Sequence, residues 1–193
     1  MSLNLIMGAR NGAKTKRDDN DFYATDPQAV KIFLETLKKD KVILNKHIWE
    51  CACGQGHMAE VFKEYGYSVI ASDLINRGYG HKLDFLNAEA CLPVDIFTNP
   101  PFKLAEDFVY KSMQILNEKS KLGLFLKIQF LETKKRKKLF EKYPPKFIYI
   151  YSARQQCALN GNFKKYKKGG KTFAYIWIIW EKGFIGETIT RWI

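Results

Sequence analysis

The amino-acid sequence predicts an α/β fold: a doubly wound sheet that is mostly parallel and has an antiparallel hairpin at one edge. From residue 43 onward, short apolar runs of strand length alternate with amphipathic stretches of helical period. Small residues and two glycines at 51–56 form a tight turn between the first predicted strand and the next helix. The last two predicted strands are joined by a basic loop at 153–171 without a clear helical pattern, which favours antiparallel pairing.

The N-terminal part divides into an arm and a helix. Residues 1–21 are polar and basic and contain glycine, so we expect a flexible arm, followed by a single domain at 22–193. Thr25 and Gln28 have the spacing of a capping box, so a helix is predicted to begin at Thr25. Apolar residues then recur at helical period: Val30, Phe33, Leu34 and Leu37.

The later elements follow from the apolar runs and from the polar or glycine-rich segments between them. Strands are expected at 46–50, 67–72, 94–98, 122–128, 146–151 and 172–180, and helices at 57–65, 104–116 and 133–143. Trp177 and Trp180 are three residues apart in the final strand, so we expect their side chains on opposite faces of the sheet.

The chain is strongly basic. Its 32 Lys and Arg residues against 20 Asp and Glu residues give a formal net charge of +12 over 193 residues. This balance favours a polyanionic partner, and the alternative is a basic but otherwise ordinary surface. Hydrophobic residues make up 46% of the chain, which is enough to build a core at this length.

Cysteine spacing and hydropathy argue against a metal-binding, a secreted or a membrane-spanning protein. Cys51 and Cys53 are two residues apart, which fits no common zinc pair, and the three histidines lack metal-ligand spacing, so we expect no metal. No apolar run reaches membrane-spanning length, and none resembles a secretion signal. We therefore expect reduced thiols, a cytoplasmic location and no membrane partner.

Three segments are expected to meet beyond the carboxyl ends of the strands, where doubly wound sheets bind ligands. Glu50 begins a loop, Glu-Cys-Ala-Cys-Gly-Gln-Gly, whose small residues let a ligand approach the backbone closely. Asp73 follows 23 residues later, close to the spacing at which an acid meets a ribose diol. Asp84-Phe85 pairs an acid with a ring that could cover a base. Taken singly, these features also fit a tight turn, a helix cap and a core aromatic.

The motif Asn99-Pro100-Pro101-Phe102 is the most informative feature of the chain. It follows the apolar run at 94–97, which indicates a buried strand. Two prolines have fixed φ and no backbone donor, so the turn that they form is stiff. A rigid amide oxygen, a bare carbonyl and a flat apolar ring suit the binding of a planar ring that carries an amino group.

With these motifs in this order, the chain resembles a class I S-adenosylmethionine-dependent methyltransferase, and more narrowly the small phage-type enzymes that modify adenine in DNA. Their hallmark, Asp/Asn/Ser-Pro-Pro-aromatic, stands here at 99–102. The segment 22–27, Phe-Tyr-Ala-Thr-Asp-Pro, is similar to the Tyr-x-Thr-Pro segment that precedes the cofactor loop in this family. The chain departs from the pattern at Asp26 and in the loop, which reads Glu-Cys-Ala-Cys-Gly instead of Asp-Pro-x-x-Gly.

The resemblance implies a Rossmann-like methyltransferase fold with S-adenosylmethionine as the cofactor. It also implies that the Asn99 side-chain oxygen and the Pro100 carbonyl accept the two hydrogens of the adenine amine, with Pro101 stiffening the turn and Phe102 stacking on the base. The residues expected at the cofactor are Tyr23, Thr25, Glu50, Ala52, Gly54, Gly56, Asp73, Leu74, Asp84, Phe85 and Asn99.

A base inside a duplex cannot reach such a pocket, so we expect base flipping. A second aromatic side chain should cover the other face of the flipped base. Phe163 is the candidate because it lies in the 153–171 loop, which we expect to face the substrate, and Tyr166 is the alternative. His57 follows the glycine loop and is expected to pack or to cap a helix rather than to bind the cofactor.

Two runs of lysine fit a role in phosphate binding, although a run of lysines is more often a solvated face. The residues expected to contact nucleic acid are Lys134, Lys135, Arg136, Lys164, Lys165, Lys167 and Lys168. DNA is the predicted partner, with RNA less favoured. Only thirteen residues follow Trp180, so we expect the DNA sequence to be read by loops, or to be read poorly.

Two alternatives stay open at this point. The same chemistry acts on RNA bases or on a protein glutamine amide in related enzymes, which usually carry an additional domain. A catalytically silent protein that binds the cofactor or DNA as a regulator is the third possibility, and the intact Asn99 argues against it. A phage or restriction-modification setting is suggested only by analogy with the family.

Overall fold

The computed structural model describes residues 23–89, 93–159, 161, 163 and 173–193. The predicted arm at 1–21 lies outside these residues. The main sheet consists of β2 (His47–Glu50), β3 (Ser68–Asp73), β4 (His81–Lys82), β5 (Asp95–Thr98), β6 (Lys121–Lys127), β7 (Phe147–Ile150), β9 (Tyr175–Glu181) and β10 (Ile189–Trp192).

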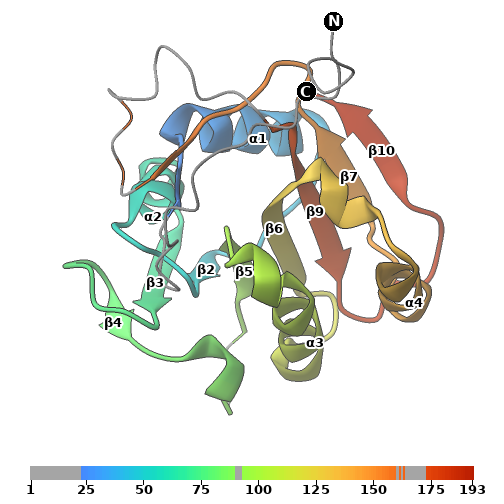
Figure 1. Cartoon of the computed structure of the whole chain (residues 1–193), viewed down its shortest axis with the longest axis horizontal. Helices are drawn as coiled ribbons and strands as arrows, with labels where there is room; N and C mark the ends of the chain where they lie inside the picture. The colour runs from blue at the N-terminus through green and yellow to red at the C-terminus, as the bar shows by residue number, and fades with distance from the viewer. Residues whose placement is uncertain (1–22, 90–92, 160, 162, 164–172) are drawn as a thin grey trace, which may run out of the picture.

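The strands of this sheet follow the order β10-β7-β9-β6-β5-β2-β3-β4, so the chain winds outward in both directions from the middle (Figure 1). All neighbouring pairs are parallel except those of β9, which runs antiparallel to both β6 and β7. This confirms the doubly wound, mostly parallel α/β fold and the antiparallel pairing of the last two predicted strands. In addition, β9 lies between β6 and β7, and β10, which the sequence analysis did not predict, occupies the outer edge.

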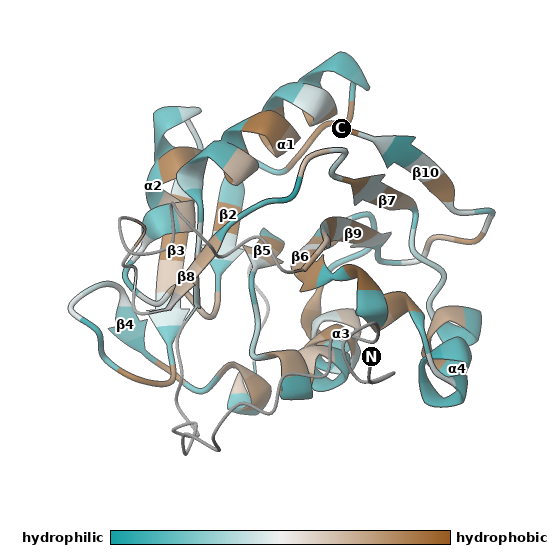
Figure 2. Cartoon of the chain, turned by 45° about the horizontal axis from the view of Figure 1, so that its top comes forward, coloured by the Kyte–Doolittle hydropathy of each residue, from teal (hydrophilic) through white to brown (hydrophobic). Residues whose placement is uncertain are grey.

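Helices cover both faces of the sheet (Figure 1). α1 (Pro27–Lys39) and α2 (His57–Glu64) pack on one face, where Phe33 stacks on Trp177 with ring centroids 4.2 Å apart. α3 (Ala105–Ile115) and α4 (Lys134–Lys142) pack on the other face, in the cluster that contains Trp180. The two tryptophans therefore lie on opposite faces, as the strand period predicts. Figure 2 shows the apolar residues concentrated in the central strands and the hydrophilic ones on the outer helix faces.

A second, two-stranded sheet joins the start of the described chain to the 153–171 segment. β1 (Tyr23–Thr25) pairs antiparallel with β8 (Cys157–Leu159), with Thr25 opposite Cys157. Thr25 is consequently a strand residue, and the predicted capping box does not form. The N-cap of α1 is Asp26, whose carboxylate accepts a hydrogen bond from the Gln28 N–H at 2.9 Å.

Candidate active site

The topology brings the predicted segments together at one edge of the sheet. β2 lies between β3 and β5 and is parallel to both, so the carboxyl ends of the three strands are neighbours. Glu50 ends β2, Asp73 ends β3, and Asn99 directly follows β5. A pocket at this edge is lined by residues from β1, the end of β2 and the loop after it, the start of α2 and the turn after β5: Tyr23, Ala24, Thr25, Glu50, Ala52, Cys53, His57, Met58 and Asn99.

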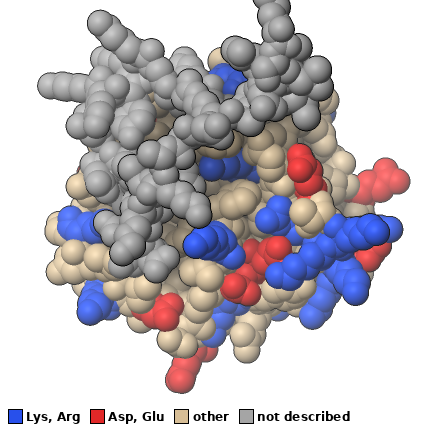
Figure 3. Space-filling view, in the orientation of Figure 1, with Lys and Arg blue, Asp and Glu red and all other residues tan. Residues whose placement is uncertain are grey.

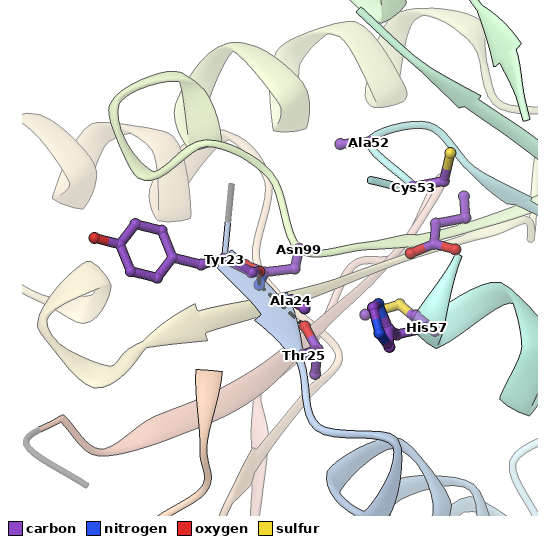
Figure 4. A pocket seen from close by; sticks show the side chains of 9 residues that line it. Tyr23, Ala24, Thr25, Ala52, Cys53, His57 and Asn99 are labelled. Atoms are coloured by element: carbon purple, nitrogen blue, oxygen red, sulfur yellow. Dashed lines mark hydrogen bonds between the residues drawn. The ribbon is translucent and has the colours of Figure 1, made fainter. Parts of the chain in front are cut away.

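The side chain of Asn99 is held by β1. Its amide nitrogen donates to the Thr25 hydroxyl at 3.0 Å and to the Tyr23 carbonyl at 3.2 Å. A carbonyl can only accept, so the nitrogen must be the atom that faces β1. Both amide hydrogens are thereby used, and the side-chain oxygen is the group left to accept a hydrogen bond from a ligand. Figure 4 shows Asn99, Thr25 and His57 gathered around the pocket, with the ring of Tyr23 turned away from His57.

The two prolines and Phe102 form the outer part of this edge. Pro100 is buried, and Pro101 is the N-cap of the short 3-10 helix η3 (Phe102–Leu104). Phe102 is 39% exposed, so part of its side chain is accessible to a ligand. The Lys127 ammonium and the Arg136 guanidinium each lie 5.5 Å from the centroid of this ring.

The glycine loop is shaped by Asp73 and Tyr79. One Asp73 carboxylate oxygen accepts from the Gly54 N–H at 2.8 Å, and the other accepts from the Ile75 N–H at 2.9 Å. Gly56 has φ +81°, and a Cβ there would lie 2.5 Å from the Tyr79 ring. Only glycine fits at this position, because a side chain would be strained and would strike the ring. Leu74, next to Asp73, is exposed.

Glu50 is an unusual group in this pocket. Its side chain is only 3% exposed, and its Oε2 has no hydrogen-bond partner among the described residues. Burial raises the pKa of Glu50 well above its ordinary value, and the negative charge of Asp73 adds to the effect, while a hydrogen bond from the Ala59 N–H opposes it. A buried carboxylate oxygen without a partner is costly. It is therefore a candidate to receive a positively charged or hydrogen-donating ligand group.

The Asp84-Phe85 pair is placed differently from the rest. The Asp84 carboxylate caps the 3-10 helix η2 (Phe85–Asn87), accepting from the Leu86 N–H at 3.0 Å and from the Asn87 side chain at 2.8 Å. Phe85 is 2% exposed and packs between Trp49 and the α3 ring Phe108. Both residues have structural roles here, and a contact with the cofactor stays a prediction.

His57 belongs to the pocket, which the sequence analysis did not expect. It is the first residue of α2, and burial lowers the pKa of its imidazole. The Phe163 ring packs edge-on against it, with centroids 5.3 Å apart. The structure thus places Phe163 on the glycine-loop side of the pocket, and its stacking on a flipped base stays a prediction. The position of His57 directly after Gly56 was the signal available in the sequence.

The basic residues fall into two groups. Lys134, Lys135 and Arg136 begin α4, whereas Lys164, Lys165, Tyr166, Lys167 and Lys168 lie outside the described residues. Glu106 of α3 forms ion pairs with Lys135 at 3.0 Å and with Arg136 at 3.2 Å. Figure 3 shows basic side chains gathered on this face beside a few acidic ones.

No helix in the described part of the chain combines the length and apolar character required to span a bilayer. The same residues contain no group of three or more His, Cys, Asp or Glu side chains arranged to hold a metal ion.

Comparison with known proteins identifies the fold. No family model and no curated protein matches this chain. Among solved structures, it is similar to a protein from Listeria monocytogenes assigned as a class I S-adenosylmethionine-dependent methyltransferase (TM-score 0.61, 16% identity, 88% of this chain and 65% of that one). It is also similar to the modification subunit of a protein from Vibrio vulnificus assigned as a type I restriction enzyme (TM-score 0.58, 15% identity, 91% of this chain and 48% of that one).

A third similar structure is magnesium protoporphyrin IX methyltransferase from Synechocystis with bound S-adenosylmethionine (TM-score 0.55, 13% identity, 81% of this chain and 79% of that one). At these identities the likeness establishes the fold alone. The chain has the Rossmann-like fold of class I methyltransferases, and it spans about two thirds of the Listeria protein and about half of the Vibrio protein.

Proposed function

We propose that this protein transfers a methyl group from S-adenosylmethionine to the exocyclic amine of adenine in DNA. The observation that carries the proposal is the fixed amide of Asn99. Its nitrogen is bound to Thr25 and Tyr23, which leaves its oxygen as an oriented acceptor at the end of β5. The stiff Pro100-Pro101 turn and the exposed Phe102 ring stand next to that acceptor.

The residues of the pocket fit the cofactor. Glu50 supplies a buried carboxylate oxygen without a partner, which suits the ammonium group of the methionine end. The glycine loop lets a ligand approach the backbone closely, and Asp73 stands at the tip of the neighbouring strand, where an acid can accept from ribose hydroxyls. The similarity to class I methyltransferase structures, one of them with bound S-adenosylmethionine, supports this assignment.

When bound, the cofactor supplies an electrophilic methyl group on a sulfonium sulfur. The adenine amine is a poor nucleophile because its lone pair is delocalised into the ring. The Asn99 side-chain oxygen and the Pro100 carbonyl would each accept a hydrogen bond from one amine hydrogen, which favours tetrahedral nitrogen and directs the lone pair out of the ring plane. The methylated amine would then release one proton to solvent, and the cofactor would leave as a neutral thioether. Phe102 fixes the plane of the base. This is alignment and electrostatic preorganisation rather than acid–base catalysis.

DNA is the proposed substrate because the face beside Phe102 is basic. The formal net charge of the chain is +12, and α4 contributes Lys134 and Lys138, which form no ion pair with any described residue. The similarity to a restriction-modification subunit agrees with this choice. An adenine in a duplex must be flipped out to reach the turn at 99–102.

The test is a transfer assay with isotopically labelled S-adenosylmethionine. The protein is incubated separately with DNA, RNA and protein pools, and the digested products are identified. Labelled N6-methyladenine from DNA supports the proposal. Label only in RNA or protein, or cofactor binding without any transfer, would refute it.

A pair of variants tests the site itself. Asn99→Ala should lower the rate of transfer by a factor on the order of 10² or more while changing cofactor affinity little, because an oriented acceptor acts mainly on the reacting amine. Asn117→Ala is the matched control, since Asn117 is exposed and follows the far end of α3. Equal rates for the two variants would show that Asn99 is not catalytic.

A further inference from the structure

A strip of exposed aromatic side chains and of basic side chains runs past the turn at 99–102; Lys135 in it is exposed, whereas Lys127 and Arg136 are partly buried. It begins at Phe173, continues through Lys127 to Phe102, and then passes over Arg136 and Lys135 to Tyr110 on α3. Phe102, Lys135 and Arg136 were predicted from the sequence to contact the substrate, whereas Phe173, Lys127 and Tyr110 were not. Phe102, Phe173 and Tyr110 are between 38% and 40% exposed, so part of each side chain is accessible to a partner.

Contacts between cations and rings join the first half of the strip. The Lys127 ammonium lies 3.7 Å from the centroid of the Phe173 ring and 5.5 Å from that of Phe102. A single cation at the end of β6 thus contacts both rings. The Arg136 guanidinium is the second cation near Phe102 and lies 5.5 Å from the centroid of that ring. Favourable interactions of this kind hold the cations beside the rings without neutralising their charge.

The second half of the strip is organised by α3 and α4. Glu106 of α3 binds both Lys135 and Arg136, so the one acidic side chain in these contacts fixes two cations in place and leaves a net positive charge. Tyr110 lies one helical turn after Glu106, on the same face of α3. The Lys142 ammonium is 5.5 Å from the centroid of the Tyr110 ring, which continues the alternation of ring and cation.

The alternation identifies the kind of partner. Cations alone would suit any acidic polymer, and exposed rings alone would suit an apolar surface. Unpaired bases on a phosphate backbone need both, because bases stack on aromatic faces while phosphates contact Lys and Arg. Paired bases in a duplex do not present their faces to such rings.

We propose that the strip formed by Phe173, Lys127, Phe102, Arg136, Lys135 and Tyr110 binds a single-stranded segment of DNA. The inference rests on the proposed function, because Phe102 is then the position at which the acceptor base stacks and the strip holds its unpaired neighbours. The strip favours substrates that are single-stranded or opened at the target.

The test measures binding of a 20-nucleotide oligothymidylate to the protein by fluorescence anisotropy, without cofactor. This probe contains no adenine, so binding is separated from methyl transfer. Tyr110→Ala and Phe173→Ala should each weaken binding by about 5-fold to 100-fold, the usual loss for one base–aromatic stack. The matched controls are Tyr65→Ala and Trp192→Ala, exposed aromatic side chains elsewhere, which should stay within about twofold of the unchanged protein.

Charge is tested in the same assay. Lys127→Gln should weaken binding and reduce its dependence on salt, whereas Lys39→Gln on α1 should do neither. Thermal melting of every variant shows whether it is folded, and a variant that unfolds is replaced by the milder Tyr110→Leu or Phe173→Leu, which removes the ring but keeps apolar bulk.

Three results would overturn the inference. The first is unchanged oligothymidylate binding by both aromatic variants. The second is tighter binding of the oligothymidylate–oligodeoxyadenylate duplex than of the single strand. The third is binding of polyglutamate as tightly as oligothymidylate, which would make the strip a site for acidic proteins. Absence of methyl transfer would refute the proposed function while leaving these binding results intact, so the two failures are distinguishable.

Discussion

Replacement of Thr25 by valine tests how the proposed active site is held together. Valine has nearly the shape of threonine but lacks the hydroxyl that accepts the Asn99 amide at 3.0 Å. Thr25 is buried, so no bulk water replaces the lost partner. The Asn99 nitrogen then retains only the Tyr23 carbonyl at 3.2 Å, and the side-chain oxygen is no longer fixed in direction. We therefore expect slower methyl transfer.

The size of the effect follows from the hydrogen bond. A neutral hydrogen bond contributes about 0.5–1.5 kcal/mol net, which corresponds to a factor of about 2 to 13 in rate. Loss of the whole acceptor in Asn99→Ala costs a factor on the order of 10² or more. If Thr25 acts only by orienting Asn99, it has nothing left to orient in the Asn99→Ala background. Thr25→Val should then lower the residual rate by less than about twofold.

The measurement is a double-mutant cycle under single-turnover conditions with saturating labelled cofactor and adenine-containing DNA. Thr25→Ser retains the hydroxyl and should remain close to the unchanged protein. The reasoning fails if Thr25→Val slows transfer by the same factor with and without Asn99. Such additivity would mean that Thr25 acts on the cofactor or substrate directly.

Three further predictions concern the pocket. Glu50→Gln should weaken cofactor binding but raise the melting temperature at pH 8. Because burial raises the pKa of Glu50, the ionised side chain destabilises the folded protein increasingly as pH rises from about 4.3, so the gain in melting temperature should vanish near pH 4. A higher melting temperature for the unchanged protein than for the variant at pH 8 would be the contrary result. Gly56→Ala should destabilise more than Gly66→Ala in urea unfolding, because both have positive φ but only Gly56 faces the Tyr79 ring; equal losses would contradict the clash. Burial raises the pKa of Cys53 to about 12, so iodoacetamide at pH 8 should label this thiol about 10³-fold more slowly in the folded than in the denatured protein. Mass spectrometry follows the labelling, and rapid labelling of the folded protein would show an accessible thiolate.

Local sequence was sufficient for most of the fold. Alternating apolar runs and amphipathic stretches predicted the order of strands and helices along the chain, because the buried face of each element gives its apolar residues the period of a strand or of a helix. The glycine loop and the motif at 99–102 could be recognised for the same reason, since their backbone geometry depends on glycine and proline at fixed positions.

Contacts between residues far apart in the chain required the tertiary structure. Thr25 resembled a helix cap locally, but pairing of β1 with β8 places its hydroxyl on Asn99, 74 residues away. Likewise, the order of the last strands and the meeting of Phe173 with Lys127 depend on where β9 inserts in the sheet. The local pattern of apolar residues determines which face of a helix or strand is buried, whereas packing of the whole chain decides which other elements that face contacts. The sequence alone thus predicted the kind of site, and the tertiary structure decided how the Asn99 amide is oriented.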